Sequence, residues 1–132
     1  MSEIGYIYNR YELLAQTIQL FNDAVLLLKK EWLLRQADTR QKYPNLSVDP
    51  DNLALARSFV VEMLKSEAEE GELLTHLSGK PNLPSRQEIA DVRAIIQQNR
   101  ILQPKHFDIL SRVLEILDGE RSILFRKLRT ST

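Results

Sequence analysis

The chain reads IYNRYELLAQTIQLFNDAVLLLKKEW from residue 7 to residue 32. Apolar side chains recur in it with alternating spacings of four and three residues, a repeat of about 3.5 residues that is typical of a helix packed lengthwise along another helix. Neither proline nor glycine occurs between Gly5 and Pro44. The stretch therefore predicts one long N-terminal helix against which the other segments pack. The residues of this seam are Ile7, Tyr11, Leu14, Ile18, Phe21, Val25, Leu28 and Trp32.

The same helix carries more apolar side chains than a single seam needs. Residues 24–28 are apolar on every side, so Leu26 and Leu33 fall on the face that is predicted to be in water. Exposed apolar clusters are typical of interaction surfaces, and Leu26 and Leu33 are therefore predicted to contact a second protein chain. A further row with a spacing of seven residues widens the stripe that faces the rest of the domain. Its members are Leu13, Leu20, Leu27 and Leu34.

Trp32 ends the seam and has two interpretations. It is either a large anchor of the core or a hot-spot residue of an interface, where tryptophan is enriched. The surrounding sequence is apolar on all sides and leaves both interpretations open. Trp32 is therefore grouped with Leu26 and Leu33 in the predicted partner-binding set, and a homodimer is the expected assembly.

The next segment is predicted to be a loop followed by a helix. Residues 38–49 lose the apolar periodicity, and Pro44 disfavours a helical conformation at Tyr43. Asp49 is predicted to cap a new helix whose first residue is Pro50, because proline fits the first helical position and aspartate accepts hydrogen bonds from free amides.

Two further helices complete the predicted fold. Ser85 and Glu88 have the spacing of a capping box, and the last helix is predicted to begin near Pro104. This last helix repeats the spacing of three and four, so it is expected to pack antiparallel to the first. The sequence therefore predicts one all-α domain over residues 1–132, a bundle of four to five helices with a long N-terminal helix.

Arg121 interrupts the apolar seam of the last helix. In one interpretation its aliphatic stem packs in the seam while the guanidinium reaches water. In the other, its charge is paired with an acidic residue of a neighbouring helix, for which Glu31 is a candidate. The first interpretation is favoured.

The composition is that of an ordinary soluble protein and excludes several classes. The chain contains 18 Lys and Arg, 18 Asp and Glu, and no Cys. A net charge of zero gives no global attraction to nucleic acid or anionic membranes. The absence of cysteine excludes disulfides and thiolate chemistry and fits a reducing compartment. No signal peptide and no transmembrane run is recognisable, so a cytoplasmic location is expected.

No combination of residues indicates catalysis, a cofactor or a metal. Glu72 and His76 share a helical face beside other acidic residues, but a second such motif is missing, and a solvated acidic face is the favoured interpretation. His106 is expected to be a surface or helix-end histidine. No nucleophile elbow and no phosphate-binding glycine motif is present. The chain is therefore expected not to be an enzyme.

The favoured prediction is a non-catalytic interaction module, such as an adaptor, regulatory or assembly subunit, that binds a protein partner through apolar helix surfaces. The alternative is a nucleic-acid-associated helical protein that uses basic residues of the last two helices. The residues of this alternative are Arg93, Arg100, Arg126, Lys127 and Arg129.

Overall fold

The computed structural model describes residues 3–70 and 84–130 of the 132-residue chain. Within these residues every regular element is an α-helix, which confirms the predicted all-α bundle with a long N-terminal helix. Glu72 and His76 lie outside the described residues. The helices are α1 (Glu3–Leu34), α2 (Ala37–Lys42), α3 (Pro50–Glu70), α5 (Arg86–Gln97) and α6 (Pro104–Thr130).

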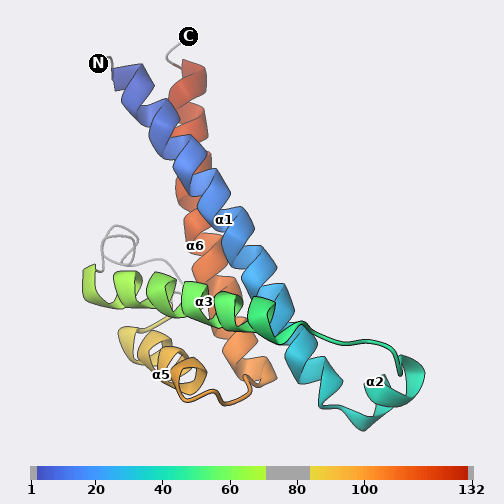
Figure 1. The fold of residues 1–132 in the computed structure, drawn as a ribbon. Coiled ribbons are helices and arrows are strands. Elements are labelled where there is room, and N and C mark those ends of the chain that lie inside the picture. Colours follow the sequence, from blue (N-terminus) through green and yellow to red (C-terminus); the bar gives the residue numbers. More distant parts are fainter. Residues whose placement is uncertain (1–2, 71–83, 131–132) are drawn as a thin grey trace.

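The two longest helices, α1 and α6, lie side by side in opposite directions, as predicted (Figure 1). Helix α3 packs against α1, and α5 packs against both α3 and α6. These two helices cover only one end of the α1–α6 pair, and the other end projects with Glu3 and Thr130 at its tip. We call this projecting part the arm, which consists of α1 before Phe21 and α6 after Leu117, and we call the remainder the base.

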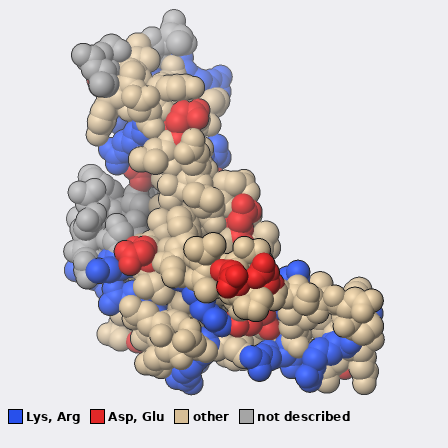
Figure 2. Space-filling view, viewed as in Figure 1, with Lys and Arg blue, Asp and Glu red and all other residues tan. Residues whose placement is uncertain are grey.

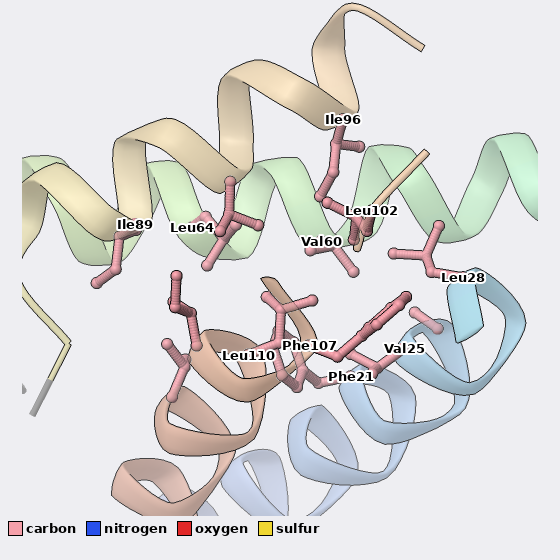
Figure 3. Packing of buried hydrophobic residues seen from close by; sticks show 14 of the residues in the cluster. Phe21, Val25, Leu28, Val60, Leu64, Ile89, Ile96, Leu102, Phe107 and Leu110 are labelled. Atoms are coloured by element: carbon pink, nitrogen blue, oxygen red, sulfur yellow. The ribbon is translucent and has the colours of Figure 1, made fainter. Parts of the chain in front are cut away.

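The core of the base is built from four helices (Figure 3). Its centre holds Phe21 of α1, Val60 of α3, Ile89 of α5 and Leu110 of α6, each 0% exposed. Burial of each such side chain contributes about 1.5–3 kcal/mol, and this burial holds α3 and α5 across the long pair. The buried cluster also contains Ala24, Val25, Leu28, Ala56, Leu64, Val92, Ile96, Leu102, Phe107, Ile109, Val113 and Leu117.

Both predicted helix starts are confirmed. At α3, the Asp49 Oδ1 atom accepts a hydrogen bond from the Asp51 N–H at 2.9 Å, and Pro50 is the first helical residue. At α5, the Ser85 hydroxyl accepts from the Glu88 N–H at 3.1 Å, and the Glu88 carboxylate accepts from the Ser85 N–H at 3.0 Å. These bonds satisfy amides that have no partner inside the helix.

The loop predicted over residues 38–49 is wrong at its beginning, because α2 occupies Ala37–Lys42. This short helix has Asp38 in its first turn and basic side chains in its last turn, an arrangement that the helix dipole favours. The irregular segment begins at Tyr43, whose φ of −130° and ψ of 69° are non-helical. That boundary agrees with the predicted effect of Pro44 on the residue before it.

Two ion pairs decide between the interpretations of Arg121. The Arg121 guanidinium is 2.9 Å from the Asp118 carboxylate, three residues earlier on the same helix, so the suggested pairing with Glu31 is wrong. Glu31 instead accepts a hydrogen bond from Arg57 of α3. Arg121 belongs to the arm and Glu31 to the base, and local spacing on α6 offers the nearer partner.

Candidate functional site

The predicted partner-binding residues lie on two different sides of α1. Leu26 and Leu33 are 53% and 42% exposed, so the described part of the chain does not enclose them. Trp32 is partly buried and packs against the core cluster of the base. Leu26 and Leu33 are two helical turns apart, and Trp32 is turned about 100° away from Leu33. The two leucines therefore form a narrow apolar strip of their own.

A larger apolar surface runs along the arm. Tyr6, Leu13 and Leu20 are 59%, 66% and 55% exposed, and their spacing of seven residues places them on one side of α1. We call these three residues the arm stripe. Ile123 of α6 is 42% exposed and lies on the same side of the arm as Leu13. The ion pair between Arg10 and Glu120, 2.8 Å long, marks this side on both helices. Leu13 comes three residues after Arg10 and Ile123 three residues after Glu120, and residues three apart share a helix face.

The sequence shows the apolar row to which this stripe belongs, but that side of α1 was expected to be covered by the other helices of the domain. Leu13 and Leu20 belong to the row with a spacing of seven residues, and Tyr6 extends that row towards the N-terminus. Helix α3 packs against α1 around Ala24 and forms a groove with Leu20, but it does not extend over the earlier turns of α1. Only Leu27 and Leu34 of the row are partly buried, and the members in the arm stay exposed.

The arm stripe leads into a groove between α1 and α3. The groove has a volume of about 400 Å³, and Leu55 in its wall is 69% exposed. Two polar side chains, Asp23 and Asn52, lie among its apolar walls. The walls also include Leu20, Ala24, Leu27, Ala56 and Phe59. Because Leu20 belongs to both the stripe and the groove, the apolar surface continues from the arm into the base.

Charges are distributed unevenly along this surface. The last turns of α6, at the free end of the arm, carry the exposed residues Arg126, Lys127 and Arg129. Near the groove the exposed charges are acidic, with Asp23 on α1 and Asp51 in the first turn of α3. Figure 2 shows acidic side chains gathered where the arm meets the base. The free end therefore carries three basic residues of α6 together with Glu3 of α1, and the exposed charges named near the groove are acidic.

The five basic residues predicted to bind nucleic acid lie in two separate places. Arg93 is on α5 and Arg100 follows that helix, so both belong to the base. The other three are the basic residues at the free end of the arm (Figure 1). Recognition of nucleic acid normally uses one basic patch or stripe. The structure does not join these five residues into one such surface, and nucleic-acid binding stays a prediction.

His106 lies at the start of α6 and has a structural contact. It is 9% exposed, and its Nδ1 atom accepts a hydrogen bond from the Gln103 N–H at 2.9 Å. Burial lowers the pKa of His106 below its usual 6.5, and the charges of Lys105 and Arg100 lower it further, against a smaller raising effect of Asp91. The predicted helix-end position is confirmed, but the side chain is buried and caps the helix in its neutral form.

Acidification is expected to destabilise the protein through His106. Its pKa is lower in the folded chain, so the unfolded chain binds the proton more strongly. This contribution to stability is present above the unfolded pKa and is lost as the pH falls through the folded value. Urea unfolding between about pH 7.5 and about pH 5.5 should show a loss of at most about 1.4 kcal/mol per pH unit from this group. A His106→Gln variant should lack this component, and an unchanged pH dependence in it would contradict the assignment.

No grouping for metal binding is found in the described part of the chain, where no three His, Cys, Asp or Glu side chains are placed to hold an ion. Within residues 3–70 and 84–130, no helix combines the length and hydrophobicity needed to cross a bilayer. Comparison with protein-family models, with curated proteins and with solved structures gave no match.

Proposed function

We propose that this chain is a non-catalytic protein-interaction module, an assembly or regulatory subunit that binds a protein partner through apolar helix surfaces. The observation that carries the proposal is the exposed arm stripe of Tyr6, Leu13 and Leu20 and its continuation into the α1–α3 groove. Exposed apolar side chains aligned on one side of a small protein are typical of interaction sites.

The architecture of the arm supports this proposal. Among the described residues no third helix covers the sides of the two-helix arm, whereas an added helix would bury the arm stripe and Ile123 together. Burial of a leucine contributes about 1.5–3 kcal/mol, so covering the stripe offers a substantial driving force for association. The strip formed by Leu26 and Leu33 is a second, smaller contact surface within the same proposal, with Trp32 supporting it from the core side.

The proposal includes self-association as the expected form of assembly and the cytoplasm as the compartment. The compartment is inferred from the absence of cysteine in the sequence, which fits reducing conditions. The helical interaction surface would be the functional part, with the base serving to hold α1 and α6 in register.

The test replaces Leu13 and Leu20 with glutamate in the untagged protein, fixes complexes inside its own cells with a chemical crosslinker, and then measures the size of the protein in extracts by sedimentation and immunoblotting. The wild type is expected to sediment as a complex heavier than the 15.3 kDa monomer, and the Leu13→Glu/Leu20→Glu variant is expected to lose that complex. Two charges buried in an apolar interface without partners cost several kcal/mol, enough to reduce binding more than a hundredfold.

A control places a charge away from the stripe on the same helix, as Gln19→Glu, at an exposed position seven residues after Glu12 and turned about 100° from Leu20. This variant should keep the complex. Leu26→Glu/Leu33→Glu in the same assay measures the contribution of the smaller strip. A wild-type protein that sediments as a monomer in the extract would overturn the proposed function.

A further inference from the structure

We infer that the occupant of the arm stripe is a second copy of this chain, lying antiparallel and centred on Leu13, with Tyr6 of each copy in the α1–α3 groove of the other. This inference rests on the proposed function and names the partner for the same surface. Four features of the chain support it: the symmetry of the stripe, the shape of the groove, the charge distribution and the size of the surface.

The spacing of the stripe suits a two-fold axis. Tyr6 and Leu20 are each seven residues from Leu13, which is two helical turns or about 10.5 Å in either direction. In a two-fold symmetric contact, a residue on the axis meets its own copy, and two residues at equal distances from it meet each other. An axis at Leu13 therefore places Tyr6 of one copy opposite Leu20 of the other.

In this arrangement the Tyr6 side chain of one copy fits the α1–α3 groove of the other in size and polarity. Leu20 forms part of the groove wall, so a residue opposite Leu20 lies at the groove entrance. The Tyr6 ring is 59% exposed in the single chain, and about 400 Å³ between α1 and α3 accommodates an aromatic ring. Tyrosine pairs an apolar body with a polar tip, and Asp23 and Asn52 are available in the groove to bind its hydroxyl.

Charge complementarity selects the antiparallel orientation. In that orientation the basic end of one arm, with Arg126 and Lys127, lies opposite Asp23 and Asp51 of the second copy. In a parallel pair the two basic ends would lie against each other. Opposite charges across an interface determine the orientation of packed helices, and like charges disfavour the alternative.

The size of the surface fits a dimer in rapid exchange. From Tyr6 to Leu27 the helix is about 32 Å long, and a contact two helices wide gives on the order of 1,200 Å² for both copies together. This is the lower limit for specific interfaces, so we expect association in the micromolar range.

The absence of native cysteine allows a direct test of register on the purified full chain. Under mild oxidation, Leu13→Cys alone should form a disulfide-linked dimer. Tyr6→Cys and Leu20→Cys should each remain largely uncrosslinked alone but should crosslink when mixed in equal amounts. Gln19→Cys, on the polar side of α1, serves as the control for random collision and should not crosslink.

Sedimentation equilibrium on the same purified chain measures the affinity. Tyr6→Ala and Leu55→Ala should each weaken dimerisation about tenfold, as expected for an aromatic residue that fills a pocket and for a residue of the pocket wall. Self-crosslinking of Tyr6→Cys and of Leu20→Cys as efficient as that of Leu13→Cys would indicate a parallel pair and overturn the inference. A purified wild type that stays monomeric would also overturn it. If the complex in cell extracts still depended on Leu13 and Leu20, the proposed function would stand with a different partner.

Discussion

Replacing Phe21 with alanine is expected to lower the free energy of unfolding by about 3–5 kcal/mol. Phe21 is 0% exposed and lies where the arm meets the base, with Phe107 and Leu110 of α6 nearby in the same core (Figure 3). Its truncation removes apolar burial and leaves a cavity that rigid neighbouring helices close only partly. Urea unfolding followed by circular dichroism measures the loss, which is a large fraction of a typical stability of about 5–15 kcal/mol.

The matched control is Leu26→Ala, five residues further along the same helix. Leu26 is 53% exposed, so its truncation should change the free energy of unfolding by no more than about 0.5 kcal/mol at concentrations where the chain is monomeric. Equal losses in the two variants would contradict the packing of α1 described above.

Removing the charge of Glu31 is expected to lower the free energy of unfolding by about 1–3 kcal/mol. Glu31 on α1 binds Arg57 on α3, and the two side chains are only 12% and 21% exposed. A Glu31→Gln variant leaves a poorly hydrated guanidinium without its counter-charge, so the loss exceeds that of a surface pair. Urea unfolding at low and high salt measures it, and the effect should depend little on salt because the pair is partly buried.

Two comparisons separate this pair from an ordinary surface pair. Arg10→Met removes the pair with Glu120, in which Arg10 is 49% exposed, and should cost less than about 1 kcal/mol. A Glu31→Leu/Arg57→Met double variant should recover part of the stability lost in the single variants, because no unpaired charge remains. Simple addition of the two single losses would show that the charges are not coupled.

The features that depend on neighbouring residues were predictable from the sequence. The 3.5-residue repeat of α1, the Asp49–Pro50 start of α3 and the capping box at Ser85 are each encoded within a few residues, and the structure confirms them. The antiparallel contact of α1 with α6 was also predictable, because two long seams with the same period fit each other.

The features that depend on distant segments were not predictable in the same way. Which part of the leucine row on α1 is covered depends on where α3 crosses, and no local pattern states that position. The arm stripe was therefore missed as a site, although Leu26 and Leu33 were expected to be exposed and are. The partner of Arg121 was also missed, since Glu31 of another helix was the named candidate and Asp118, three residues earlier on the same helix, was not considered.

The shared position of Glu3 and Thr130 at the tip of the arm has a practical consequence. A fusion partner or affinity tag added at either terminus would emerge a few residues from the Tyr6 ring, where its bulk would compete with whatever binds there. Untagged protein, or a label inserted near Tyr43 on the opposite side of the molecule, would leave that region accessible.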